Sequence, residues 1–141
     1  MSRDLILHFL KRHRLAVIST LSRENKSQSA LVGIAVSDRF ELVFDTVKTS
    51  RKYLNMAENP FVSVVIGWDE ETTVQYEGIA SELQGGEAAI YKEIYFSVFS
   101  EGRLREQTSP NIVYFKVTPK WLRYSNFNQP VDIEEISEPF Y

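Results

Sequence analysis

FDTVKTSRKYLNMAENPFVSVVI, residues 44–66, joins the end of one expected strand to a short helix and a second strand. Thr49 or Ser50 can cap the helix, because a hydroxyl at that position accepts a hydrogen bond from the first turn. The helix is expected to end before Pro60, since the residue before a proline is pushed away from helical geometry. Phe61–Ile66 is rich in β-branched residues, which is typical of a strand.

The part of the chain before residue 44 predicts a helix and two hairpins. Residues 2–13 place apolar side chains at helical spacing, and a short strand, Leu15–Leu21, follows. Polar residues 22–26 form the expected hairpin loop, and Gln28–Ser37 has apolar residues on both faces. A strand buried on both faces indicates a barrel with something packed outside it. A turn then leads into a strand over Phe40–Phe44.

The part after residue 66 predicts more strands and one longer helix. The expected elements are a strand over Thr72–Leu83, a helix over 87–99, a polar loop over Ser100–Asn111 and strands over Ile112–Val117 and Trp121–Tyr124. The tail, Asn126–Tyr141, is expected either to extend along a partner surface or to be disordered. The connections between strands are of hairpin length, which favours an antiparallel barrel with peripheral helices over a doubly wound parallel sheet. The expected fold class is therefore mainly β (α+β).

Composition describes one ordinary domain and excludes several functions. The chain has 141 residues, is 43% hydrophobic and has no cysteine, which excludes disulfides and thiolate chemistry. The net charge of −3 argues against a nucleic-acid partner. No run approaches the roughly 18 to 20 apolar residues that span a bilayer, and no secretory leader is recognisable, so a cytoplasmic location without a membrane partner is expected.

Charge is distributed unevenly along the chain. Residues 1–128 hold 16 basic and 15 acidic groups, whereas the tail 129–141 holds four acidic residues and no basic one. The sequence therefore divides into a nearly neutral domain, 1–128, and an acidic C-terminal tail, 129–141. The four acidic residues of the tail are Asp132, Glu134, Glu135 and Glu138.

The segment Thr46–Lys52 has the composition of an anion site. It places three cations and three hydroxyls in seven residues, at the end of a strand and the start of a helix. Free backbone N–H groups and the helix dipole favour an anion at such a helix start, and Arg51 and Lys52 add a fork of donors and a point charge. The alternative is a capped helix start that is merely solvated.

The order of these elements resembles the pyridoxamine 5′-phosphate oxidase-like superfamily. The resemblance covers residues 13–126 and is most specific in Phe44–Lys52 and Asn59–Ile66, with further likeness in Gly78-Ile79-Ala80 and Pro119–Phe127. It implies an FMN-binding split β-barrel of six to seven antiparallel strands. It also implies a homodimer with the cofactor at the subunit interface.

The resemblance also implies the cofactor-binding residues. Thr46 and the helix start would hold the FMN phosphate, residues 29–32 would line the isoalloxazine edge, and Gln75 or Thr73 would contact the flavin from the second subunit. The full implied set is Ser29, Ala30, Leu31, Val32, Thr46, Thr49, Ser50, Arg51, Lys52 and Gln75. No catalytic residue and no metal ligand is implied.

Three departures separate this chain from true pyridoxamine phosphate oxidases. Those enzymes have an arginine where this chain has Ala30 and a tryptophan where it has Ser125, and they end in an Arg/His-rich segment that grips the substrate phosphate. The expected function is therefore that of an FMN-dependent oxidoreductase of the related type, acting on an unidentified small molecule. The alternatives are a relative that binds a deazaflavin or haem and a non-enzymatic, stress-related flavin-binding module.

Other residues are interpreted structurally. His8 and His13 are five residues apart, a spacing that does not place two metal ligands on one helix face. Arg103 and Arg105 are expected in a solvated loop, with a lid over an anionic substrate as the alternative. The aromatic residues Tyr91, Tyr95, Phe96 and Phe99 are expected to pack a helix on the barrel. The alternation of Trp121 and Arg123 with Leu122 and Tyr124 leaves open which pair faces the cofactor.

Overall fold

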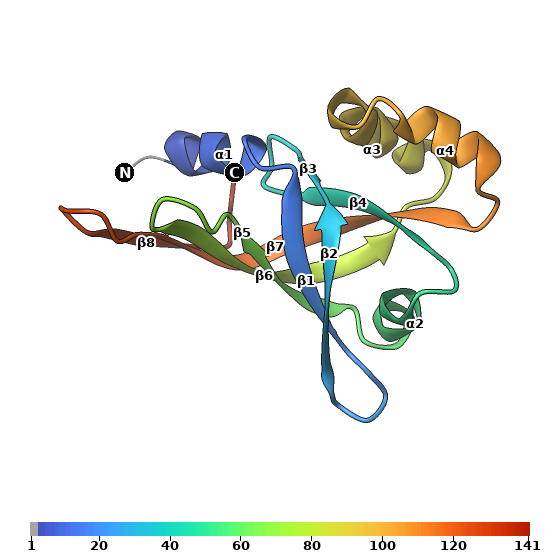
Figure 1. Ribbon diagram of the computed structural model, residues 1–141, viewed down its shortest axis with the longest axis horizontal. Coiled ribbons are helices and arrows are strands. Elements are labelled where there is room, and N and C mark those ends of the chain that lie inside the picture. The colour runs from blue at the N-terminus through green and yellow to red at the C-terminus, as the bar shows by residue number, and fades with distance from the viewer. Residues whose placement is uncertain (1–2) are drawn as a thin grey trace.

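The computed structural model describes residues 3–141 as a curled antiparallel sheet with helices around it (Figure 1). The strand order is β2-β1-β5-β6-β7-β4-β3, and β8 pairs with β7. The strands are β1 (Leu15–Leu21), β2 (Ser27–Gly33), β3 (Ala35–Val36), β4 (Leu42–Val47), β5 (Phe61–Ile66), β6 (Thr72–Glu82), β7 (Ile112–Asn126) and β8 (Asp132–Ser137). The helices are α1 (Arg3–Lys11), α2 (Arg51–Glu58), α3 (Gly85–Val98) and α4 (Gly102–Thr108). The expected mainly β, split-barrel fold with peripheral helices is confirmed.

A break at Ile34 closes the barrel. β2 ends at Gly33 on one edge of the sheet, and β3 begins at Ala35 on the other edge. At the break, the Ile34 N–H donates to the carbonyl of Arg14 (2.8 Å). The prediction of one continuous strand over Gln28–Ser37 was wrong, because apolar residues continue through the break and give no local signal of it.

The two faces of β2 are not equally buried. Val32 points into the barrel and is 6% exposed, whereas Leu31 on the opposite face is 61% exposed. The expectation that this strand is buried on both faces fails at Leu31 within a single chain. The residues after the break, Ile34 to Val36, are buried.

Helix α2 forms as predicted. Ser50 is its N-cap, and the Ser50 Oγ accepts from the Tyr53 N–H (3.3 Å). Asn59 is extended and precedes Pro60, so the helix ends where the proline rule places its end. The expected first helix is also present as α1, and Ser2, which that expectation includes, lies outside the described residues.

A fourth helix replaces the loop predicted over Ser100–Asn111. α4 has little apolar pattern of its own, and side chains of its neighbours hold it. Arg103 pairs with Glu93 of α3, and Arg105 pairs with Asp45 of β4. The helix was missed because contacts between elements stabilise it, whereas its hydrophobic periodicity is weak.

Strand β7 is continuous through Pro119, where two separate strands were predicted. The register with β6 shifts at this point, pairing Glu77 with Trp121 and Gly78 with Pro119, so that Lys120 has no opposite residue. Such a bulge accepts a proline, which has no N–H to donate to the ladder. A Cβ on Gly78 would lie 2.4 Å from the Thr118 carbonyl oxygen, so the bulge requires glycine there.

The variant Gly78→Ala is expected to lower the free energy of unfolding by about 2–3 kcal/mol, the usual effect of overpacking a rigid site. Gly86→Ala is the matched control, because a Cβ there meets nothing within 4 Å and alanine favours the helix. Urea unfolding of both variants measures the difference. Equal stability of the two variants would contradict the role given to Gly78.

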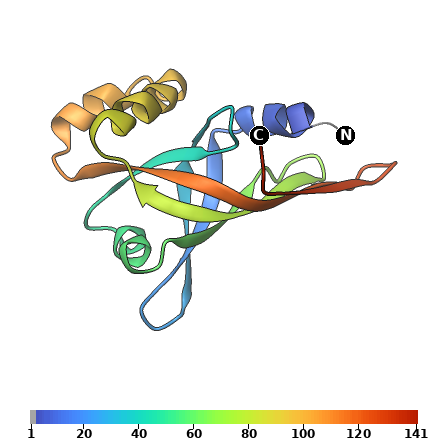
Figure 2. The same cartoon turned by 180° about the vertical axis from the view of Figure 1, so that it is seen from behind.

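The acidic tail adds a strand to its own sheet. Residues Asp132–Ser137 pair with β7 as β8, and the hairpin of β7 and β8 extends past the end of the barrel (Figure 2). Phe140 is 4% exposed and packs against Phe40, with 5.7 Å between the ring centroids. Both expectations for the tail, extension along a partner surface and disorder, were wrong over these residues, because the tail is extended along its own sheet. Its pairing with β7 depends on backbone groups, which composition does not reveal.

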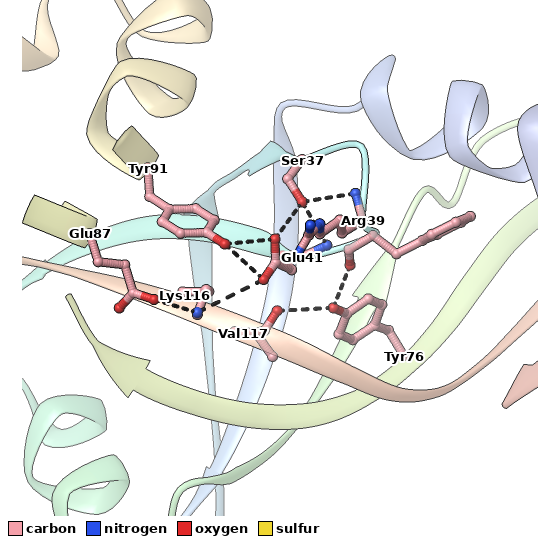
Figure 3. A network of polar contacts seen from close by, with 9 residues as sticks. Ser37, Arg39, Glu41, Tyr76, Glu87, Tyr91, Lys116 and Val117 are labelled. Atoms are coloured by element: carbon pink, nitrogen blue, oxygen red, sulfur yellow. Dashed lines mark hydrogen bonds and ion pairs between the residues drawn. The ribbon is translucent and has the colours of Figure 1, made fainter. Parts of the chain in front are cut away.

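A buried carboxylate ties α3 to the hairpin of β3 and β4 (Figure 3). Glu41 is 6% exposed, and its carboxylate accepts hydrogen bonds from the Ser37 hydroxyl (2.9 Å) and the Tyr91 hydroxyl (3.0 Å to each oxygen). Lys116 lies 3.9 Å from Glu41 and 2.9 Å from Glu87. Burial is the main cause that raises the pKa of Tyr91, and the nearby Glu41 carboxylate adds to it.

Candidate functional site

The start of α2 and the end of β4 are joined by a hydroxyl pair. Thr46, which is 7% exposed, lies 2.9 Å from Ser50 between the two side-chain oxygens. Because Ser50 is also the N-cap, the strand end and the helix start are fixed relative to each other. The first turn of α2 therefore presents its free N–H groups from a rigid position.

A hollow of about 160 Å³ lies between this helix start and the hairpin of β1 and β2. Its lining combines side chains of both elements: Thr20, Gln28, Ser29, Ala30, Ser50, Arg51 and Lys52. Five of these are residues that the sequence analysis singled out. The hollow therefore gathers two cations, hydroxyls and helix N–H groups, which is the chemistry that a phosphate group requires.

The other predicted residues lie outside this lining. Thr46 stands behind Ser50, and Thr49 is exposed at the turn before it. Leu31 and Val32 belong to β2, an edge strand that pairs only with β1 among the strands of residues 3–141. The outer edge of β2 therefore has backbone N–H and C=O groups that are free to bind a ligand.

Gln75 lies far from the hollow within one chain. It is on β6 and exposed, and β1 and β5 separate it from β2. Three strand spacings correspond to about 14 Å. Gln75 therefore does not line the hollow within one chain.

Three polar residues near the hollow were missed by the sequence analysis. Asn55 of α2 is 9% exposed, and its Nδ2 donates to the Thr20 hydroxyl (2.9 Å) and the Gln28 side-chain oxygen (3.0 Å). These bonds hold α2 against both strands of the hairpin. A polar residue on the inner side of an amphipathic helix was the signal that could have identified Asn55.

Burial and the charge of Asp45 both act on the pKa of Lys52 at the hollow. Burial lowers the pKa of the Lys52 ammonium, and the negative charge of Asp45 acts in the opposite direction. Asp45 directly precedes Thr46, and its carboxylate accepts a hydrogen bond from Arg105 (2.9 Å). The lid interpretation of Arg105 is therefore not supported, because this arginine is paired within the chain.

Burial shows which of the alternating residues near the end of β7 fill the barrel. Leu122 and Tyr124 are 0% and 4% exposed and fill the barrel. Trp121 and Arg123 lie on the outer face, where both donate to the Glu135 carboxylate of β8, and Arg123 is in register with Gln75. The outer pair is thus the one that a ligand near Gln75 would meet.

The aromatic residues of α3 pack as expected. Tyr95 and Phe96 are buried in a second apolar cluster beneath the helix, and Phe99 packs against it. Burial raises the pKa of Tyr95 well above its usual value, with a further contribution from the charge of Asp45. Tyr91 donates to Glu41, so these side chains stabilise the fold.

Larger hollows exist, and chemistry rather than size distinguishes the one at α2. One of about 410 Å³ adjoins it and shares Gln28 and Arg51, and another of about 360 Å³ lies between α1 and α3. The first also has two cations, Arg23 and Arg51, but the carboxylates of Glu24 and Glu58 line it too and Arg23 pairs with Glu58, whereas no carboxylate lines the hollow at α2. Within residues 3–141, no three potential metal-ligating side chains cluster, and none of the helices combines the length and apolarity that crossing a bilayer requires.

Comparison with known proteins shows the same fold in several solved structures. No curated protein matches the chain. Among solved structures, general stress protein 26 from Bacillus anthracis str. Sterne is 27% identical with a TM-score of 0.74, over 96% of this chain and 97% of that protein. The haem storage protein HutZ from Vibrio cholerae is 13% identical with a TM-score of 0.70, over 83% of this chain and 89% of that protein.

A haem-binding protein from Mycobacterium smegmatis is 14% identical, with a TM-score of 0.84 over the whole of this chain. The chain spans 60% of the length of that protein. The family model described as pyridoxamine 5′-phosphate oxidase matches residues 2–126. The chain therefore belongs to the pyridoxamine 5′-phosphate oxidase family.

Proposed function

We propose that this protein binds FMN, with the cofactor phosphate in the hollow at the start of α2, and acts as a flavin-dependent oxidoreductase on a small molecule. The observation that carries the proposal is the convergence of Ser50, Arg51 and Lys52 with the hairpin residues Ser29 and Ala30 around one hollow. A phosphorylated group is the ligand that such a lining favours. Because the chain belongs to the pyridoxamine 5′-phosphate oxidase family, we propose that this phosphate is part of a flavin.

Each part of the site has a distinct task in this proposal. Arg51 binds phosphate oxygens as a planar fork, Lys52 adds a point charge, and Ser50 and the first N–H groups of α2 complete the donors. The free edge of β2 over residues 29–32 offers N–H and C=O groups to the polar edge of a flavin ring. Bound FMN supplies the redox chemistry, accepting a hydride or electrons.

Titration of the purified protein with FMN, followed by flavin fluorescence and the visible spectrum, tests the proposal. We expect saturable binding of one FMN per chain. A protein that fails to bind FMN, or that binds a deazaflavin far more tightly, would refute the cofactor assignment. Turnover of bound reduced flavin by a small-molecule acceptor separates an enzyme from a binding module of the kind that the name general stress protein 26 suggests.

Haem is the second candidate, because two similar structures are named as haem proteins. The two histidines, His8 and His13, lie in or directly after α1, and Figure 1 shows α1 on the opposite side of the molecule from α2. Neither histidine lines the hollow at α2. A Soret band in the purified protein would favour haem over FMN.

We also propose that the protein is a homodimer built on the outer face of the sheet. Apolar side chains are exposed there on three neighbouring strands: Leu15 (46%), Leu31 (61%), Phe61 (46%) and Val65 (41%). Val17 lies in register between Leu31 and Val65, so these three side chains form a continuous apolar row across the strands. An apolar patch of this kind is typical of an interface, and a second subunit would bring its own Gln75 toward the hollow.

A cytoplasmic location stays a prediction from the sequence.

Val65→Arg is expected to convert a dimer into a monomer, since it would place a charge in the apolar patch. Ile90→Arg is the matched control, because Ile90 is 65% exposed on α3, away from this face. Light scattering after size exclusion gives the mass of each variant. A wild-type monomer, or a Val65→Arg dimer, would contradict the proposed interface.

A further inference from the structure

The charge of one carboxylate acts on a lysine of the phosphate hollow: Asp45 does not line the hollow, but its negative charge favours the charged form of the Lys52 ammonium and so opposes the lowering of the Lys52 pKa by burial. Asp45 directly precedes Thr46, whose hydroxyl lies 2.9 Å from that of Ser50 at the helix start. Lys52, two residues after Ser50, lines the hollow. A free carboxylate at Asp45 would repel a phosphate and attract the Lys52 ammonium.

The structure pairs this carboxylate with α4. The Arg105 Nη2 donates to Asp45 Oδ2 (2.9 Å) and to the Tyr95 hydroxyl (3.2 Å). Tyr95 is 2% exposed, so the second bond fixes the guanidinium against a rigid group. The Asp45 side chain is only 19% exposed, and its charge is therefore poorly screened by water.

The other charged side chains of α4 have different partners. Arg103 pairs with Glu93, and Glu106 pairs with Lys92 of α3. Arg105 is therefore the residue of this helix whose charge is directed at Asp45. From the sequence alone, Arg105 was expected only as a solvated cation or as part of a lid.

We infer that Arg105 is a positioning residue for the cofactor phosphate, because it neutralises Asp45 and so leaves the Lys52 ammonium free to bind the phosphate. This inference rests on the proposed function. Without Arg105, the Asp45 carboxylate loses its partner cation, and its full charge acts on the Lys52 ammonium at the hollow. The carboxylate then acts against both the lysine and the ligand.

FMN titrations of four variants test the inference. Arg105→Ala is expected to raise the dissociation constant for FMN about tenfold, since one charge-assisted hydrogen bond to the phosphate is lost. Arg103→Ala on the same helix is the control and should stay within about twofold of wild type. Arg105→Lys should recover part of the loss.

The double variant Asp45→Asn with Arg105→Ala separates electrostatics from structural support. If Arg105 acts by neutralising Asp45, removing both charges restores FMN affinity to within about threefold of wild type. If Arg105 only holds α4 in place, the loss persists in the double variant, and the inference is wrong. Unchanged affinity in Arg105→Ala, with wild type binding FMN, overturns it as well.

Nuclear magnetic resonance of the Lys52 ammonium in cofactor-free protein gives a readout that does not depend on FMN. Arg105→Ala is expected to raise the pKa of Lys52, because the full charge of Asp45 then acts on it, and the double variant should not show this rise. A Lys52 pKa that does not respond to Arg105→Ala would refute the inference. Absence of FMN binding by wild type would instead refute the proposed function, and the two failures are thus distinguishable.

Discussion

Replacing Arg51 and Lys52 together with alanine is expected to weaken FMN binding by about 3–6 kcal/mol, the loss of two charge-assisted hydrogen bonds of about 1.5–3 kcal/mol each. That loss corresponds to roughly a hundredfold to ten-thousandfold increase in the dissociation constant. Isothermal calorimetry or flavin fluorescence measures it. Both side chains line the hollow, and no other pair of cations does so within residues 3–141.

The same double variant should leave the cofactor-free protein folded. Neither side chain donates a hydrogen bond to any part of the chain that the structure describes, and the cap of α2 is made by Ser50. The melting temperature of the cofactor-free variant is therefore expected to match that of wild type. Loss of the fold would show that the segment is structural.

Lys48→Ala is the matched control for this pair. Lys48 belongs to the same cationic segment, but it is exposed before the helix start and does not line the hollow. Its removal is expected to change FMN affinity by less than about 1 kcal/mol, as for other exposed charges. If Lys48→Ala and the double variant weakened binding equally, general electrostatic attraction rather than a built phosphate site would account for the affinity.

Glu41→Ala is expected to lower the free energy of unfolding by about 3 kcal/mol, because the Ser37 and Tyr91 hydroxyls lose their acceptor at a buried site. Figure 3 shows how the carboxylate joins the β3–β4 hairpin to α3. Urea unfolding measures the change. Tyr91→Phe should remove about 1 kcal/mol, the net value of one hydrogen bond.

Glu87→Ala tests whether burial of the Glu41 carboxylate causes the large expected loss of stability in Glu41→Ala. Both glutamates are near Lys116, but the Glu87 side chain is 53% exposed and that of Glu41 is 8% exposed. The Glu87 variant is expected to change stability by at most about 1 kcal/mol, as for a surface ion pair. A double-mutant cycle of Glu41→Ala and Tyr91→Phe should give a coupling near 1 kcal/mol. Additive effects would mean that the two residues stabilise the fold independently.

The start of α2 shows which features of the site could be predicted from the sequence. Ser50 as a cap and the end of α2 before Pro60 follow from local rules, because capping and the proline effect act within a few residues. The cations Arg51 and Lys52 could likewise be assigned to one helix start. The partners across the hollow could be named from a family resemblance, but their approach depends on the barrel that carries β2.

The missed elements share one physical cause. α4 is held by pairs such as Arg105 with Asp45, and these residues are 60 positions apart in the chain. β8 forms because β7 offers it a free backbone edge, and no side-chain pattern in the acidic tail indicates that pairing. Contacts of this kind come from other elements, so a local reading of the tail or of residues 100–111 could not contain them.

The sequence by itself determined the class of fold, the cap and end of α2, and the cluster of cations at Arg51 and Lys52. These properties depend on alternation, spacing and composition, which act over a few neighbouring residues. Only the tertiary structure decided that the chain crosses from one edge of the sheet to the other at Ile34, that Asn55 holds α2 against the hairpin of β1 and β2, and that Arg105 pairs with Asp45. Those facts depend on which distant segments meet, because burial and charge pairing are properties of the packed molecule.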